Sequence, residues 1–92
     1  LVNATMKLGR NGGGHIGPAL AYDANLGMSY ETLFGGRKKV STVEPNSIAK
    51  KLGLTSGDVI LTMQVSNGRY EVTFNDAETG RRYTSWYQTW RP

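Results

Sequence analysis

Residues 43–61 constrain the fold of this 92-residue chain more than any other part of it. Pro45 ends an apolar strand, and the Ser47 hydroxyl can cap a helix by accepting a hydrogen bond from a free backbone N–H. Apolar residues then recur at helical spacing up to Gly53, which can end the helix in a left-handed conformation. Leu54 follows as an isolated apolar residue that we expect in the core. This part of the chain therefore predicts a strand, one short helix and a glycine stop.

The continuation of this segment predicts a tight turn and a buried strand. Gly57 and Asp58 suit the turn, in which the Asp58 carboxylate is expected to accept backbone hydrogen bonds. Residues 59–65 are rich in β-branched and long apolar side chains, which favours a strand. Asn67 and Gly68 then predict a two-residue hairpin turn, because both central residues of a type I′ turn need a positive φ.

Short runs of alternating apolar and polar residues predict strands in the rest of the chain. The further expected strands cover residues 1–8, 26–34, 39–43, 70–74 and 82–90. Residues 18–24 fit either a strand or one helical turn, and residues 1–17 fit either an integral strand with a glycine-rich loop or a flexible arm. The pattern predicts one mainly β domain over residues 1–92, with one or two short helices, arranged as a small, partly open barrel or sandwich.

Residue types that carry catalysis or bind metals are sparse. The chain has no cysteine, which excludes disulfides and thiolate metal sites, and its one histidine, His15, cannot build a zinc site alone. Residues 12–17 formally match G-x-G-x-x-G, but the chain is too short for the βαβ fold that a dinucleotide site needs. We therefore predict no enzymatic activity, no catalytic residue, no metal and no cofactor. No run of about 18 apolar residues is present to cross a membrane.

A positive net charge makes nucleic acid an alternative partner. The net charge is +4 and the isoelectric point is near 9.6. Arg81 and Arg82 precede Trp86 and Trp90, and aromatic side chains flanked by arginine can stack on bases. Strand alternation would divide the aromatic side chains of residues 83–90 between two faces. Packing against the core and along an edge is therefore the favoured explanation of these aromatic residues.

Residues 43–61 resemble the corresponding region of PDZ domains, especially those of the bacterial type. The family pattern there is roughly V-x-P-G-S-P-A-x-x-A-G-L-x-x-G-D-x-I-L. Without a gap, the chain matches this pattern at Pro45, Ser47, Ala49, Gly53, Leu54, Gly57, Asp58, Ile60 and Leu61. The departures are Asn46, Ile48 and Leu52. The resemblance implies structural turns at Asn46, Gly53, Gly57 and Asp58, and asparagine tolerates a positive φ better than other non-glycine residues.

Upstream, residues 25–28 resemble the PDZ loop that binds the carboxylate of a peptide. The resemblance implies that backbone N–H groups of Leu26, Gly27 and Met28 capture a C-terminal carboxylate.

The strand after this loop would then be the binding edge. The resemblance implies that Ser29, Tyr30 and Glu31 pair with the peptide by β-augmentation. A second, longer helix normally forms the other wall of the PDZ groove, whereas residues 66–69 pass directly into another strand here.

The function that the resemblance implies is non-catalytic binding of a protein or an extended peptide. Because the sequence begins at Leu1, we expect a processed product or an excised domain of a larger exported bacterial protein, in the periplasm, in the cell envelope or secreted. Two alternatives stay open. One is a small basic β-barrel that binds nucleic acid through Arg81, Arg82, Trp86 and Trp90, and the other is a PDZ-like structural or assembly domain with no working groove.

Overall fold

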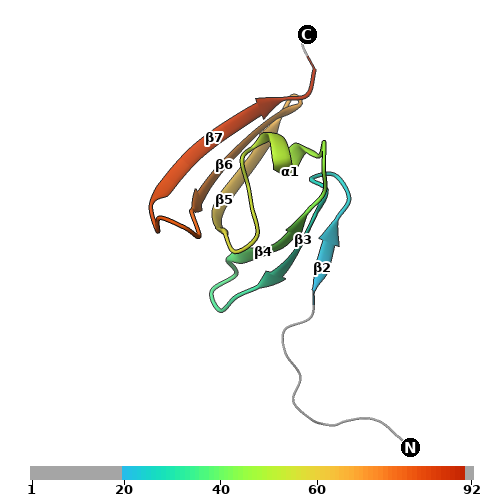
Figure 1. Ribbon diagram of the computed structural model, residues 1–92. Coiled ribbons are helices and arrows are strands. Elements are labelled where there is room, and N and C mark those ends of the chain that lie inside the picture. Colours follow the sequence, from blue (N-terminus) through green and yellow to red (C-terminus); the bar gives the residue numbers. More distant parts are fainter. Residues whose placement is uncertain (1–19, 91–92) are drawn as a thin grey trace, which may run out of the picture.

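One antiparallel sheet of six strands forms the framework of the computed structural model, which describes residues 20–90 (Figure 1). The strands are β2 (Ala21–Asp23), β3 (Met28–Thr32), β4 (Lys38–Val43), β5 (Val59–Ser66), β6 (Arg69–Asn75) and β7 (Arg82–Gln88). They pair in chain order, so the sheet is open, with β2 at one edge and β7 at the other. The predicted mainly β class, with a small open architecture and one short helix, is confirmed.

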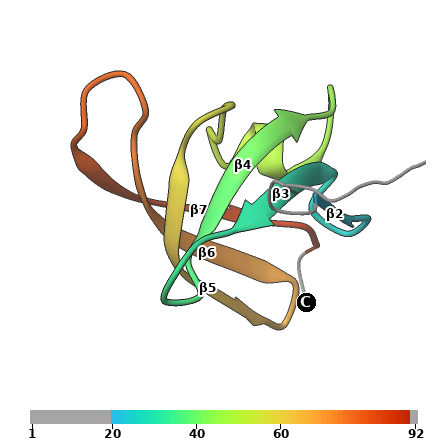
Figure 2. The ribbon, with the colours of Figure 1, turned by 90° about the horizontal axis from the view of Figure 1, so that it is seen from below.

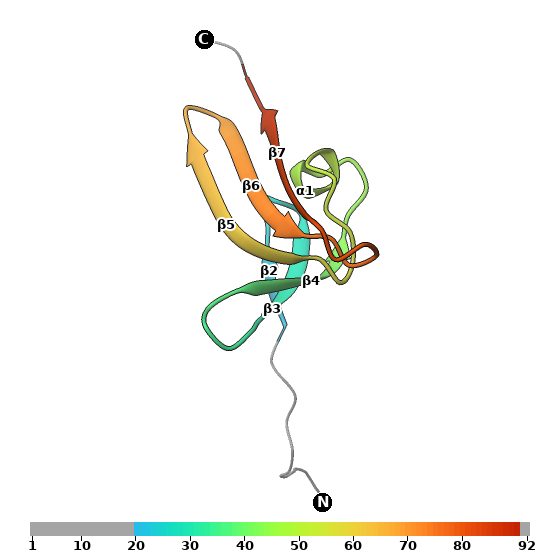
Figure 3. The ribbon, with the colours of Figure 1, turned by 90° about the vertical axis from the view of Figure 1, so that its left-hand side faces the viewer.

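The sheet is strongly bent, as Figures 2 and 3 show. Its two halves, β2–β4 and β5–β7, are joined where Lys38 and Lys39 pair with Ile60 and Val59, and where Val40 exchanges backbone hydrogen bonds with Asp58 and Gly57. Because this junction is so short, the two halves can splay around a core instead of lying in one plane. The helix α1 (Ile48–Lys51) lies between the halves (Figure 1).

Residues next to α1 in the sequence determine where this helix begins and ends. The Ser47 side chain accepts a hydrogen bond from the Lys50 N–H at 3.1 Å, which is the predicted N-cap. Asn46 before the cap has a φ of 61°, and Gly53 after the helix has a φ of 86°. Both residues therefore occupy the left-handed region in which glycine and asparagine are cheapest.

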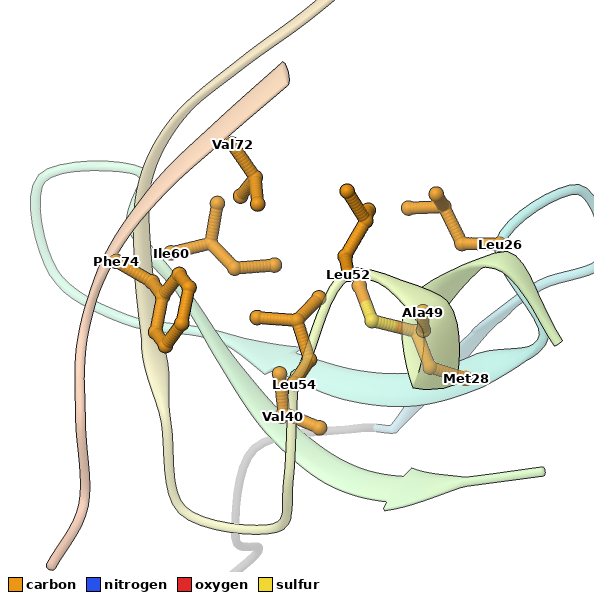
Figure 4. Close-up of a cluster of buried hydrophobic side chains, with 9 residues drawn as sticks. All are labelled: Leu26, Met28, Val40, Ala49, Leu52, Leu54, Ile60, Val72 and Phe74. Carbon is orange, nitrogen blue, oxygen red and sulfur yellow. The ribbon is translucent and has the colours of Figure 1, made fainter. Parts of the chain in front are cut away.

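Nine buried side chains fill the space between α1 and the sheet (Figure 4). They are Leu26, Met28, Val40, Ala49, Leu52, Leu54, Ile60, Val72 and Phe74. Leu54 has an exposed fraction of 0%, so the prediction that it lies in the core is confirmed. At roughly 25 cal/mol per Å² of buried apolar surface, this cluster is the main stabilising feature of the domain.

Asp58 is buried beside this core and joins two distant turns. Its exposed fraction is 0%. One carboxylate oxygen accepts the Thr55 N–H at 2.8 Å and the other accepts the Ala77 N–H at 2.8 Å. Asp58 thus accepts backbone hydrogen bonds within its own turn, as predicted, and also holds the turn between β6 and β7.

The boundaries of several elements differ from the sequence-based expectation. The strand expected over residues 26–34 begins at Met28, because Leu26 and Gly27 belong to the turn that connects β2 with β3. The ambiguous residues 18–24 contain β2. The expected strand at residues 1–8 and the glycine-rich loop with His15 lie outside the described residues.

The hairpin formed by β5 and β6 is well defined. Asn67 and Gly68 have φ values of 51° and 76°, as the type I′ prediction requires. β5 and β6 pair from Val59 to the turn, and within residues 20–90 α1 is the only α-helix. The second helix that forms one wall of the groove in PDZ domains therefore has no counterpart in the described part of the chain.

Candidate functional site

The loop that resembles a carboxylate site already uses its N–H groups inside the chain. The Leu26 N–H donates to a side-chain oxygen of Asp23 at 2.9 Å, and the Gly27 N–H donates to the Asp23 carbonyl at 2.8 Å. The carbonyl groups of Leu26 and Gly27 accept the Ala49 and Glu44 N–H groups, at 2.8 and 2.9 Å. A peptide carboxylate would therefore have to replace Asp23 at these N–H groups.

The strand after this loop is paired along both sides. Residues Ala21–Asp23 stand opposite Tyr30, Ser29 and Met28, while β4 pairs with the other side of β3. The structure thus brings these predicted peptide-binding residues together, but it places β2 on the edge where the peptide was expected. Glu31 lies one residue beyond the pairing with β2. In this arrangement, an incoming strand would have to displace β2.

A side-chain contact also holds β2 in place. The Tyr22 hydroxyl donates a hydrogen bond to the Glu44 carboxylate, just beyond the end of β4. This hydrogen bond, together with desolvation and the negative charges of Glu44 and Asp23, raises the pKa of Tyr22 above its ordinary value. The contact is exposed, so it orients β2 without burying it.

The opposite edge of the sheet is different, because β7 has a strand on one side only. β7 pairs with β6 over seven residues without a register shift. Beyond its two ends, the Asp76 N–H donates to the Arg81 carbonyl at 2.8 Å, and the Thr89 N–H donates to the Gly68 carbonyl at 2.8 Å. In an antiparallel ladder, hydrogen-bonded pairs alternate with pairs that are not hydrogen-bonded. Because Arg81 and Thr89 are both bonded across to the β6 side, the odd-numbered residues of β7 are the ones whose backbone groups bond to β6.

The backbone N–H and C=O groups of the other β7 residues lie in the plane of the sheet and point outward from its open edge. They belong to Arg82, Thr84, Trp86 and Gln88. Figure 1 shows β7 along the margin of the molecule that lies far from β2. Sequence reasoning considered Arg82 and Trp86 for nucleic-acid binding but missed this edge as a site for β-augmentation. The succession of C-terminal strands separated by short turns is the signal that could have found it, since strands paired in chain order leave the last of them at an edge.

The side chains of β7 divide between the two faces of the sheet, as alternation predicted. Ser85 faces α1 and donates a hydrogen bond to the Leu52 carbonyl at 2.6 Å. Tyr87, on the same face, has its ring centroid 5.0 Å from the Lys51 amino group. Trp86 lies on the outer face with an exposed fraction of 56%. β7 therefore carries Tyr83 and Tyr87 on its inner face and Trp86 on its outer face, beside its open edge.

The residues proposed for nucleic-acid binding do not make one stacking platform. Arg82 and Trp86 share the outer face of β7. However, the Arg69 guanidinium covers one face of the Trp86 ring, at 4.1 Å from its centroid. Trp90 lies beyond the end of β7 against Gly68, where an added Cβ would be 2.2 Å from the indole nitrogen. Arg81 belongs to the turn before the strand.

Other kinds of site are not found among residues 20–90. They contain no cluster of three or more side chains that could hold a metal ion, and they enclose no pocket. No helix in this part of the chain is long and apolar enough to cross a membrane. Comparison with protein-family models, with curated proteins and with solved structures finds no match for this chain. The two sheet edges are thus the candidate sites.

Proposed function

We propose that this domain is a non-catalytic protein-binding module that takes up an extended segment by β-augmentation along β7. One observation carries the proposal: a seven-residue strand has backbone donors and acceptors on an edge that no described residue covers. An added strand would satisfy these groups and would lie beside Trp86 on one face of the sheet and beside Tyr83 and Tyr87 on the other. Main-chain hydrogen bonds would supply affinity, and the flanking side chains would supply specificity.

The resemblance to PDZ domains supports the same class of function at a different edge. PDZ domains bind by β-augmentation, and this chain has turns at Asn46, Gly53 and Gly57 with φ values of 61°, 86° and 95°. Binding at Leu26 and Gly27 requires release of Asp23 and β2, whereas binding along β7 requires no rearrangement. On the same resemblance, we place the module in a larger exported bacterial protein.

A backbone amide chemical-shift titration with a pool of short peptides carrying free C-termini tests the proposal. We expect the largest shifts at Arg82, Thr84, Trp86 and Gln88, because their N–H groups point outward. Shifts concentrated at residues 26–31 would instead assign binding to the PDZ-like loop after displacement of β2. Silence at both edges, in a sample whose molar mass is that of the monomer, would contradict the proposed function.

Nucleic acid is the second candidate, and one observation favours it: Arg82 and the exposed Trp86 lie on the same face of β7. A parallel titration with a single-stranded oligonucleotide tests this function. Nucleic-acid binding should weaken steeply between low and moderate salt, because condensed counterions are released. Peptide binding through main-chain hydrogen bonds should change only slightly over the same range.

A further inference from the structure

β7 has few of the features that keep edge strands from pairing with copies of themselves, since its one charged side chain, Arg82, is at its first residue. Natural edges are shortened, bulged, or carry lysine or proline. β7 has seven residues, contains neither lysine nor proline, and pairs with β6 without a register shift. By contrast, β2 at the other edge has three residues. The long edge is therefore a template for a further strand, and β7 itself fits that template.

The outer face of β7 is complementary to itself when two copies pair antiparallel around Ser85. In that register Arg82 stands opposite Gln88 of the second copy. Thr84 stands opposite Trp86 of the second copy. No two like charges oppose each other, although the chain as a whole carries a charge of +4. A threonine beside an aromatic ring is also a favourable cross-strand pair in antiparallel sheets.

The face of β7 toward α1 is complementary in the same register. Tyr83 stands opposite Tyr87 of the second copy, so an aromatic pair forms on each side of the central Ser85 residues. The exposed fraction of Tyr83 is 42% in the single chain, and a neighbouring strand would cover part of this ring. Aromatic cross-strand pairs are among the pairs that stabilise a sheet.

The alternation of inward- and outward-pointing backbone groups along β7 also suits this register. Pairing centred on Ser85 opposes even-numbered residues with even-numbered residues, and these are the ones whose N–H and C=O groups point outward. A shift by one residue would oppose an outward-pointing residue with an inward-pointing one. It would also bring side chains of opposite faces together.

We infer that β7 pairs antiparallel with β7 of a second copy of this chain, with Ser85 at the two-fold axis. The two sheets then join into one continuous sheet, and the domain acts as an assembly module. This inference rests on the proposed function, since it names the strand that the β7 edge takes up.

Cross-linking through one introduced cysteine tests the register. The chain has no cysteine, so Ser85→Cys introduces a unique thiol. Opposed residues of a non-hydrogen-bonded pair have Cα atoms about 4.5 Å apart, which a disulfide can bridge. We expect Ser85→Cys to give a covalent dimer on mild oxidation at least tenfold faster than Thr84→Cys or Trp86→Cys. Faster cross-linking of either control would overturn the register centred on Ser85.

Molar mass measured by sedimentation across a concentration series tests the edge. We expect the wild-type mass to rise from 10.1 kDa toward twice that value. Thr84→Pro removes an outward N–H and should remain monomeric with an unchanged circular dichroism spectrum, whereas Thr84→Ala should still dimerise.

Three outcomes separate this inference from the proposed function. A dimer that survives Thr84→Pro would overturn the assignment to β7. A wild-type chain that stays monomeric, with no cross-linking of Ser85→Cys, would overturn dimerisation altogether. If peptides still shift the amides of residues 82–88 in such a monomer, the inference fails while the proposed function stands.

Discussion

The two edges of the sheet differ in how many unpaired backbone groups they expose. β2 is three residues long, and contacts of Tyr22 with Glu44 and of Asp23 with Leu26 fasten it to the rest of the domain. β7 is seven residues long, flanked by exposed aromatic rings and unpaired on its outer side among the described residues. A short strand exposes few backbone groups, whereas a long one exposes a continuous row. The comparison indicates that the β7 edge offers a longer row of unpaired backbone groups than the β2 edge.

The largest expected effect comes from removing the carboxylate that supports the β7 half. Asp58→Ala deletes the acceptor for the Thr55 and Ala77 N–H groups, and we expect the free energy of unfolding to fall by roughly 3–5 kcal/mol. Urea unfolding measures the change. The matched control is Asp76→Ala, because Asp76 accepts backbone N–H groups in an exposed turn and should cost about 1 kcal/mol. Equal losses in the two variants would mean that burial of Asp58 does not matter.

A pair of proline variants tests which β7 residues point outward. Ser85→Pro removes an N–H that bonds β6 and also the hydroxyl that donates to the Leu52 carbonyl, so we expect a loss of about 3 kcal/mol. Thr84→Pro removes an outward N–H and should cost less than about 1 kcal/mol at protein concentrations at which the wild type is monomeric. Thermal and urea unfolding report both values. A larger loss in Thr84→Pro would reverse the assigned phase and remove the basis of the proposed edge.

A pair of alanine variants tests how tightly the β2 end is packed. Gly27 has a φ of 75°, and an added Cβ would lie 2.4 Å from the Ser47 Cβ. We expect Gly27→Ala to lower the free energy of unfolding by about 2 kcal/mol, through the positive φ and through this clash. Gly35→Ala is the control, since Gly35 has a φ of 88° but open space around it, and should cost about 1 kcal/mol. If the two variants are equally stable, the contact between the loop and α1 is not tight.

The smallest expected effect is alkaline loosening of β2. The hydrogen bond to Glu44 raises the pKa of Tyr22, so its stabilisation is present below the ordinary tyrosine pKa of about 10 and is lost as the pH rises through the raised pKa. The methyl chemical shift of Ala21, within β2, should move in that window. Tyr22→Phe should abolish the movement. A persistent movement in this variant would assign it to another group.

Much of the fold could be predicted because its signals are local. The cap at Ser47, the stop at Gly53 and the hairpin turn at Asn67 and Gly68 depend on preferences of φ and on single hydrogen bonds. The position of Leu54 in the core follows from its isolation between two turns. Peptide binding at residues 26–31 depends on which strand lies along β3, and no local signal in the sequence determines that.

The sequence by itself determined the turns, the short helix, the alternation of faces along β7 and the role of Asp58 as an acceptor of backbone hydrogen bonds in its own turn. Only the tertiary structure decided that β2 covers β3, that Arg69 covers Trp86 and that the Asp58 carboxylate reaches Ala77. The physical reason is the difference in sequence separation over which the two kinds of interaction act. Local conformational preferences act within a few residues, whereas edge occupancy depends on which distant segments meet once the core between the two halves of the sheet is packed.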